Sequence, residues 1–201
     1  MKKIRVPIGF ALFQERKNHE GIKVNHMAHR IVIIGTTGTG KTTLARRIAQ
    51  KSGIAHIELD ALNWEANWTQ TSPDIFRARV ETALQPDEWV IDGNYGKVRD
   101  ITWGRATMIV WLDYPFLINF WQLFRRTMVR LLTRESLWGH SHETWRSQFF
   151  TKDSLFLWFL KTYGRHRREI PILLAQSEYR HLRSIHLRHP SETEHWFSEF
   201  H

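Results

Sequence analysis

The stretch Gly35-Thr-Thr-Gly-Thr-Gly-Lys-Thr42 decides the fold of this chain. It fits the pattern G-x-x-x-x-G-K-[ST] at every defined position. Its glycines let the backbone curl so that several N–H groups point at one anion. A helix that begins directly after the loop adds the positive end of its dipole. The stretch therefore predicts a phosphate-binding loop.

The residues on either side of the loop support this prediction. Residues 30–34 read Arg-Ile-Val-Ile-Ile, a β-branched apolar run that is typical of a buried parallel strand. Residues 43–51 have a helical pattern, with Leu44, Ala45 and Ile48 on one face. Strand, loop and helix thus follow one another in the order that a phosphate-binding loop requires.

The pattern also assigns roles within the loop. We expect Lys41 to reach the β- and γ-phosphates and the hydroxyl of Thr42 to ligate Mg²⁺. The residues predicted to contact the phosphates are Gly35, Thr36, Thr37, Gly38, Thr39, Gly40, Lys41, Thr42 and Thr43.

The composition is that of an ordinary globular protein. The chain has 201 residues, enough for one domain with a sizeable core, and 42% of them are hydrophobic. The absence of cysteine excludes disulfides and Cys-ligated zinc, and it fits a reducing compartment, so we expect a cytoplasmic protein. No apolar run approaches the roughly 18 residues of a membrane span. We therefore expect no membrane partner, and a monomer by default.

Positive charge is concentrated in one part of the chain. The formal net charge is +9, and the segment from Phe120 to Arg168 holds ten Lys and Arg residues but three acidic ones. Beside a phosphate-binding loop, such a segment favours the binding of a triphosphate. Binding of nucleic acid stays open as a second interpretation, because a high isoelectric point is also typical of proteins that bind nucleic acid.

The domain organisation is simple. Residues 1–26 show no clear period and precede the first predicted strand, so we expect a poorly ordered N-terminal extension. Residues 27–201 predict one α/β domain in which strands alternate with helices. Within it, residues from about 134 to 168 are expected to form a helical, arginine-rich lid. Its cluster at 165–168 is placed to close over the phosphates.

Carboxylates follow three predicted strands. The three predicted strands are residues 55–59, 88–92 and 107–113. The carboxylates at or directly after their ends are Asp60, Asp92 and Asp113. This edge of an open α/β sheet borders the ligand crevice. Asp92 is the first choice for holding Mg²⁺ opposite Thr42, and Asp113 is a rival that the pattern alone does not separate from it. Asp60 either contacts the phosphate acceptor or a metal-bound water, or it caps a turn at 60–63.

Aromatic and cationic candidates lie on the predicted loops. Trp64 and Trp68 are four residues apart and could stack on a substrate ring, although packing under a flap explains them equally well. Arg99 lies in a segment, residues 94–105, that we read as a loop just past a strand end. That is a suitable position for an arginine that binds the acceptor.

Further arginines occupy the predicted helices. Arg126 and Arg130 are four residues apart on a long helix that begins after Pro115, so they share a face. Together with Arg167 from the lid, they could neutralise the charge that develops during phosphoryl transfer.

A phosphate loop, five strands alternating with helices, and arginines on a lid resemble the nucleoside monophosphate kinases, adenylate kinase in particular. A narrower resemblance is to a bacterial, adenylate-kinase-like group labelled DNA topology modulation protein. It covers about residues 28–200. The residues that carry it are Leu59–Trp64, Trp89–Tyr95, Arg99–Asp100, Trp111–Pro115, Arg125–Thr127 and Asp153–Ser154.

This resemblance implies the fold of P-loop NTPases: a five-stranded parallel sheet of order 2-3-1-4-5, flanked by helices, with an arginine-rich lid. It also implies ATP as the phosphate donor, together with Mg²⁺. In adenylate kinases, Asp-Gly after the third strand is followed by Phe-Pro-Arg, whose arginine grips the acceptor nucleotide. Here Asp92-Gly93 is followed by Asn94-Tyr95-Gly96, and Arg99 is the candidate to replace that arginine.

The sequence thus favours a nucleotide-kinase-like phosphotransferase that moves the γ-phosphate of ATP to a small acceptor. One alternative is an ATP-dependent regulator associated with DNA topology, with slow or no turnover, although no helix-turn-helix is evident. Another is an ATP-binding protein without catalysis. The residues expected to be catalytic are Lys41, Asp60, Arg126, Arg130 and Arg167. Those expected to bind the acceptor or the metal are Asp60, Trp64, Arg99, Thr42 and Asp92.

Overall fold

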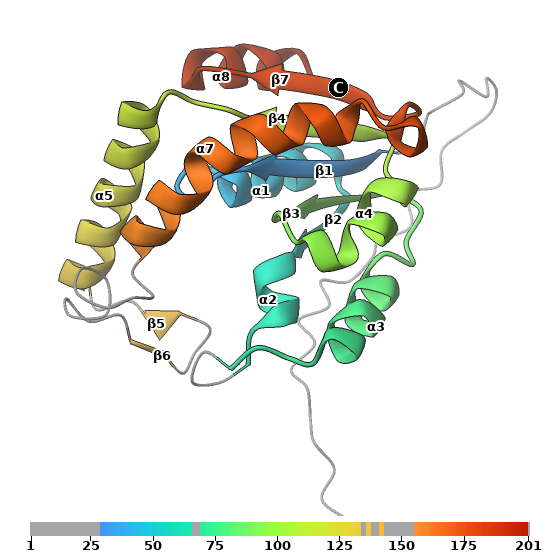
Figure 1. The fold of residues 1–201 in the computed structure, drawn as a ribbon, viewed down its shortest axis with the longest axis horizontal. Coiled ribbons are helices and arrows are strands. Elements are labelled where there is room, and N and C mark those ends of the chain that lie inside the picture. Colours follow the sequence, from blue (N-terminus) through green and yellow to red (C-terminus); the bar gives the residue numbers. More distant parts are fainter. Residues whose placement is uncertain (1–28, 66–68, 134–135, 138–140, 143–154, 201) are drawn as a thin grey trace, which may run out of the picture.

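The core of the protein is a five-stranded parallel sheet (Figure 1). The computed structural model describes residues 29–65, 69–133, 136–137, 141–142 and 155–200. The strands follow the order β2-β3-β1-β4-β7, which confirms the predicted order 2-3-1-4-5. The strands are β1 (Arg30–Gly35), β2 (Ala55–Glu58), β3 (Trp89–Asp92), β4 (Met108–Leu112) and β7 (Arg183–Leu187).

Helices cover both faces of the sheet, so alternate residues of one strand enter different cores. Ile31 and Ile33 of β1 pack against α1 (Lys41–Ser52) and α8 (Pro190–Glu199). Val32 and Ile34 pack on the other face. That second core is covered by α3 (Pro73–Ala83), α4 (Arg99–Arg105) and α7 (Leu155–Leu174). Burial on both sides explains why the three central strands, β3, β1 and β4, read as mainly apolar runs.

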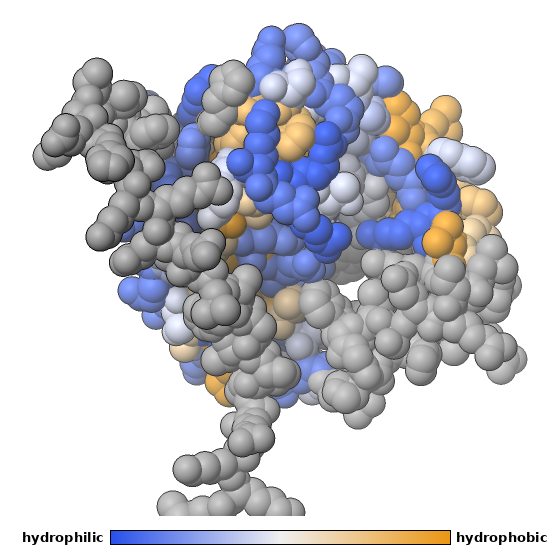
Figure 2. Space-filling model, turned by 180° about the vertical axis from the view of Figure 1, so that it is seen from behind, coloured by the Kyte–Doolittle hydropathy of each residue, from blue (hydrophilic) through white to orange (hydrophobic). Residues whose placement is uncertain are grey.

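The remaining elements connect these layers. They are α2 (Leu59–Asn63), the 3₁₀ turn η2 (Gly96–Val98), α5 (Phe116–Thr133), the short antiparallel pair β5 (Ser136–Leu137) and β6 (Ser141–His142), and η3 (Ser177–Tyr179). Figure 1 shows α5 standing beyond the ends of the strands of the main sheet and α7 crossing in front of the sheet. The opposite face, seen in Figure 2, is largely hydrophilic.

Two predicted boundaries were wrong. Strand β2 ends at Glu58, and Asp60 lies inside α2, not at the end of a strand. Helix α2 begins early because Leu59 is buried at its first position. The segment at 94–105, read as a loop, contains η2 and helix α4. Burial of Trp103 against Tyr179 stabilises α4 there, a tertiary contact that local pattern does not reveal.

Helix α7 is longer and more regular than the sequence indicated. It runs without interruption from Leu155 to Leu174, through Gly164 and Pro171. The predicted lid at about 134–168 therefore overlaps the first two thirds of this helix. The rest of the lid lies mostly outside the described residues, as does the predicted extension at 1–26. Within the described residues, none of the helices combines the length and apolar character that a membrane span requires.

Candidate active site

The loop between β1 and α1 has the backbone geometry that its sequence predicts. Gly35 has φ +153°, and a Cβ at this position would lie 2.5 Å from the carbonyl oxygen of Leu112, so a larger residue does not fit. Gly40 adopts a left-handed conformation, with φ +86°, immediately before α1 begins. Thr39 closes the loop, because its hydroxyl donates to the carbonyl oxygen of Thr36 at 2.9 Å.

Lys41 lies over this loop. Its Nζ donates to the carbonyl oxygen of Thr36 at 2.8 Å, so the ammonium group bends back across the glycine turn. Burial lowers the pKa of the Lys41 ammonium, against the opposing effect of the Asp92 and Asp60 carboxylates. A partly desolvated cation above a ring of backbone amides is suited to gripping a polyphosphate.

Helix α5 brings Arg126 to the same place. Asn119 donates from Nδ2 to the hydroxyl of Thr36 at 3.2 Å, and a Cβ on Gly38 would lie 3.0 Å from the Cβ of Leu123. One face of α5 therefore packs on the loop, and Arg126 continues that face. The proximity of Arg126 contributes to the lowered pKa of Lys41. Arg126 therefore lies near Lys41, and its predicted role in phosphoryl transfer stays a prediction.

Asp92 and Thr42 meet directly. The hydroxyl of Thr42 lies 2.5 Å from Oδ2 of Asp92, which is buried at the end of β3. The second carboxylate oxygen, Oδ1, lies 2.9 Å from Nε2 of His56 on β2. A hydroxyl and a carboxylate oxygen form a donor set that suits Mg²⁺. Among the described residues, no cluster of three or more His, Cys, Asp or Glu side chains offers a different kind of metal site.

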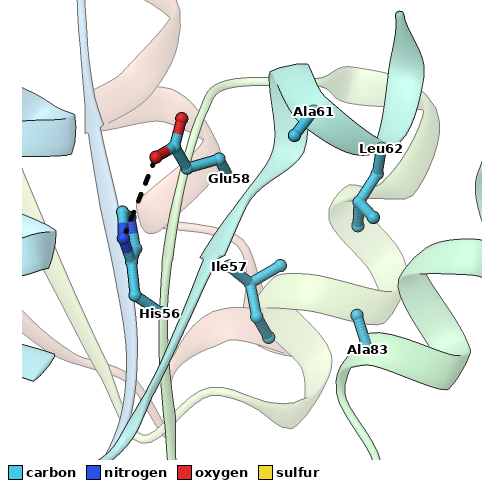
Figure 3. A pocket seen from close by; sticks show the side chains of 6 residues that line it. All are labelled: His56, Ile57, Glu58, Ala61, Leu62 and Ala83. Atoms are coloured by element: carbon cyan, nitrogen blue, oxygen red, sulfur yellow. Dashed lines mark ion pairs between the residues drawn. The ribbon is translucent and has the colours of Figure 1, made fainter. Parts of the chain in front are cut away.

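His56 is in turn held near a second carboxylate. Its Nδ1 lies 4.0 Å from Oε1 of Glu58, and Arg46 of α1 lies 3.6 Å from the same oxygen. Burial raises the pKa of the Glu58 carboxyl, and the nearby Asp92 carboxylate adds to this effect. The two side chains face each other along β2 (Figure 3).

Figure 3 also shows a pocket beside edge strand β2, between that strand and helices α2 and α3. Its volume is about 350 Å³. The lining residues are His56, Ile57, Glu58, Ala61, Leu62 and Ala83. None of them was predicted as a site residue, and the contact of His56 with Asp92 links the pocket to the loop.

Asp113, the rival candidate for Mg²⁺, has other partners. Oδ1 of its buried carboxylate lies 2.7 Å from Nε of Arg167, and Oδ2 lies 3.1 Å from Nε2 of His186. The imidazole of His186 stacks on Trp111 with ring centroids 4.0 Å apart. Arg167 also donates to the hydroxyl of Tyr163 at 3.0 Å. The structure therefore ties Asp113 to α7 and β7, and places Arg167 on that carboxylate.

The predicted acceptor residues lie on the other side of the loop. Asp60 is exposed on α2, and its Oδ1 accepts a hydrogen bond from the hydroxyl of Tyr95 at 2.6 Å. Burial raises the pKa of the Tyr95 phenol, and the Asp60 carboxylate raises it further, so this hydroxyl stays a donor. Trp64 is half-buried and pairs its backbone with Gln70. Trp68 lies outside the described residues.

Arg99 begins helix α4, and its guanidinium lies 5.1 Å from the ring centroid of Trp103. Its Nε is buried without a hydrogen-bond partner in the described part of the chain. Arg130 belongs to α5, but its side chain lies outside what the structure describes. Of the predicted arginines, Arg126 lies near Lys41, Arg99 lies near His166, and Arg167 pairs with Asp113.

Two site residues escaped the sequence analysis. His56 contacts the carboxylate of Asp92. The sequence feature that could have indicated it is a polar residue within the predicted strand 55–59. His166 of α7 accepts a hydrogen bond at Nε2 from Nδ2 of Asn94, at 3.2 Å. The sequence feature that could have indicated His166 is its helical spacing from Phe159, Thr162 and Ile170, which places it on the inward face of the helix.

Comparisons with known proteins agree with the loop and strand assignments. Residues 31–91 match the family model described as ATPase family associated with various cellular activities (AAA), which spans the loop and continues to β3. No curated protein matches the chain by sequence.

Three solved structures are similar to the chain. A gluconokinase from Sinorhizobium meliloti has 20% identity and a TM-score of 0.48, with 85% of this chain and 91% of that chain covered. A shikimate kinase from Bacteroides thetaiotaomicron has 16% identity and a TM-score of 0.48, with 85% and 94% covered. A shikimate kinase from Acinetobacter baumannii, solved with shikimate, has 14% identity and a TM-score of 0.47, with 86% and 90% covered.

All three likenesses are distant, so the class of protein follows from the chain's own geometry. The glycine loop joins β1 to α1, and the parallel sheet has the order β2-β3-β1-β4-β7. Together these define the fold of P-loop NTPases. The narrower resemblance to the DNA topology modulation group stays a prediction.

Proposed function

We propose that this chain is an ATP-dependent phosphotransferase of nucleotide-kinase type, which moves the γ-phosphate of ATP to a small acceptor. One observation carries the proposal. The hydroxyl of Thr42 meets the buried carboxylate of Asp92 directly beside the ammonium of Lys41 and the glycine loop. A hydroxyl and a carboxylate at that point suit Mg²⁺, which phosphoryl transfer from ATP requires there.

The residues present fit both ATP and Mg²⁺. The loop backbone and Lys41 supply N–H donors and one positive charge for a triphosphate. Thr42 and Asp92 would supply the hard oxygen ligands that Mg²⁺ prefers. When bound, Mg²⁺ neutralises charge on the β- and γ-phosphates.

The chain's own cations assist the transfer. In the reaction, an acceptor oxygen forms a bond to the γ-phosphorus while the bond to the bridging oxygen breaks, and ADP leaves. Lys41 and Arg126 lie on the same side of the loop, where negative charge accumulates on the transferring group. Arg130 and Arg167 are further candidates for this role once the lid has closed, and closure would require Arg167 to leave Asp113.

The acceptor is placed opposite these cations. Asp60, oriented by the hydroxyl of Tyr95, is available to accept a hydrogen bond from an acceptor hydroxyl. Arg99 offers a guanidinium on the same side, and Trp64 offers a half-buried ring. Binding therefore holds donor and acceptor on either side of Lys41, and this positioning supplies much of the rate enhancement.

Calorimetry and transfer assays test this proposal. The wild type should bind Mg-ATP with saturation, and a screen of nucleotides, sugars and other hydroxyl compounds should identify an acceptor. Lys41→Ala should lower the transfer rate by a factor of about 10³ or more. Lys51→Ala is the matched control, because Lys51 lies in the last turn of the same helix and contacts carbonyl oxygens of α8. Full activity in Lys41→Ala would refute the assignment.

A further inference from the structure

Helix α7 places a histidine where its inward face meets the candidate active site. Phe159, Thr162 and Ile170 on this face are buried against the rest of the protein. His166 lies on the same face, one turn before Ile170, and is half-buried. No role in the proposed transfer has been assigned to it so far.

The contact with Asn94 fixes which ring nitrogen carries the proton. An amide nitrogen can only donate, so Nε2 of His166 accepts the hydrogen bond from Nδ2 of Asn94, at 3.2 Å. In a neutral imidazole the proton then lies on Nδ1, which becomes the donor. This Nδ1 is buried and has no hydrogen-bond partner within the described residues. A buried donor without an acceptor costs about 1–3 kcal/mol, and a ligand oxygen would relieve that cost.

The surroundings keep His166 neutral. Burial lowers the pKa of its imidazole to about 4, and the nearby Lys41, Arg165 and Arg99 act in the same direction, against a weaker effect of Glu169. A second imidazolium charge beside these cations would repel them. A neutral N–H donor, in contrast, contributes a hydrogen bond to the site without adding to that repulsion.

Arg99 presents a second donor of the same kind. Its Nε is also buried and unpartnered within the part of the chain that the structure describes. Both Arg99 and the Lys41 ammonium lie close enough to His166 to lower the pKa of its imidazole. An anion beside His166 would balance this positive charge and offer an acceptor to an unused N–H group.

We propose that Nδ1–H of His166 donates a hydrogen bond to a phosphate oxygen held between Lys41 and Arg99, and that Asn94 fixes the imidazole tautomer that makes this possible. The inference rests on the proposed phosphotransferase function. The oxygen belongs either to the γ-phosphate of ATP or to an anionic group on the acceptor, and the chemistry of recognition is the same for both.

Two substitutions separate the two ring nitrogens. The side-chain amide of Gln reaches the position of Nε2, so His166→Gln can keep the contact with Asn94 but loses the donor at Nδ1. The shorter amide of Asn reaches the position of Nδ1, so His166→Asn keeps a donor towards the site. If His166 only packs, His166→Gln should perturb the protein less than His166→Asn, because Gln fills more of the space. If the proposal is right, His166→Asn should weaken phosphate binding less than His166→Gln.

Calorimetry distinguishes the two sources of the phosphate oxygen. If the γ-phosphate is bound, His166→Gln should weaken Mg-ATP binding about tenfold and leave Mg-ADP binding unchanged. If the acceptor's anion is bound, ATP and ADP affinities should stay equal to those of the wild type. Binding of inorganic phosphate to the Mg-ADP complex should then weaken about tenfold. The inference is wrong if neither affinity changes, or if His166→Asn loses as much as His166→Gln.

Nitrogen NMR gives a readout that a structural role would not produce. In the wild type, the proton of His166 should be found on Nδ1, and the Nδ1 resonance should shift when the phosphate ligand is added. A proton on Nε2, or no shift of Nδ1 on saturation, overturns the inference. These failures differ from failure of the proposed function, which would appear as no binding of Mg-ATP to the wild-type protein.

Discussion

The hydroxyl of Thr42 lies 2.5 Å from the carboxylate of Asp92, although 50 residues separate the two in the chain. Thr42 opens the helix after the glycine loop, and Asp92 ends the neighbouring strand, β3. Parallel pairing of β1 with β3 sets Ile33 beside Asp92, which brings the carboxylate to the base of the loop. The sheet register therefore positions the pair of oxygens that we assign to Mg²⁺.

The different partners of Asp92 and Asp113 predict different effects of neutralising them. Asp92→Asn should weaken the Mg²⁺-dependent part of ATP binding at least about tenfold, because it removes a charged oxygen beside Thr42. Asp113→Asn should leave the Mg²⁺ dependence unchanged and lower the free energy of unfolding by about 1–3 kcal/mol, because Arg167 and His186 lose their charged partner. Calorimetry across a Mg²⁺ series and urea unfolding measure the two quantities. The reverse pattern would assign the metal to Asp113.

His56 should act on the metal through Asp92. His56→Ala removes the group that holds Oδ1 of Asp92 at 2.9 Å, so the carboxylate can rotate away from Thr42. We expect the Mg²⁺ affinity of the ATP complex to fall roughly tenfold. His56→Gln should recover part of this loss, because its amide can donate to the same oxygen. Equal losses in both variants would show that His56 contributes packing and no orientation.

Gly35 should be intolerant of a side chain. Gly35→Ala places a Cβ 2.5 Å from the carbonyl oxygen of Leu112, at a backbone angle that L residues rarely adopt. We expect the free energy of unfolding to fall by at least about 2 kcal/mol. Gly164→Ala is the matched control. Apart from its own helix backbone, no atom of the described residues lies within 4 Å of its added Cβ, and an alanine inside α7 should stabilise the protein by about 0.5–1 kcal/mol.

The pKa of His166 predicts a pH dependence of stability. In the unfolded chain the imidazole titrates near 6.5, whereas in the folded protein its pKa is lowered to about 4. The unfolded state therefore binds the proton first, and the stability present above pH 6.5 falls as the pH drops towards 4. The loss reaches at most about 3 kcal/mol. Urea unfolding at several pH values should show a shallower decline in His166→Gln than in the wild type. Parallel curves would contradict a lowered pKa at this site.

The sheet could be predicted because its strands carry local signals. Residues 30–34 are apolar and β-branched, and the glycine loop follows them at fixed spacing. Helix α3 also begins at a local signal, because Ser72 accepts a hydrogen bond from the backbone N–H of Ile75 and Pro73 follows it. Helix α4 was missed because its stability comes from Trp103 packing on Tyr179, which is distant in sequence.

The candidate site was predicted in part for the same reason. Thr42 and Asp92 follow from a motif and from the end of a strand, two features that can be read locally. His56 and His166 depend on which strands and helices become neighbours, and spacing along the chain does not carry that information. The partner of Asp113 could not be predicted either, because Arg167 reaches it from α7, a helix that is distant in sequence.

Because α7 is one continuous helix, His166 and Arg167 belong to the same structural element. The helix has 20 residues and behaves as one rod about 30 Å long. His166 forms a hydrogen bond with Asn94, which follows β3, and Arg167 forms an ion pair with Asp113, which follows β4. Neighbouring positions on a helix point about 100° apart, so these two contacts join one helix to two different segments of the chain. The residues that follow β3 and those that follow β4 are therefore held by the same helix.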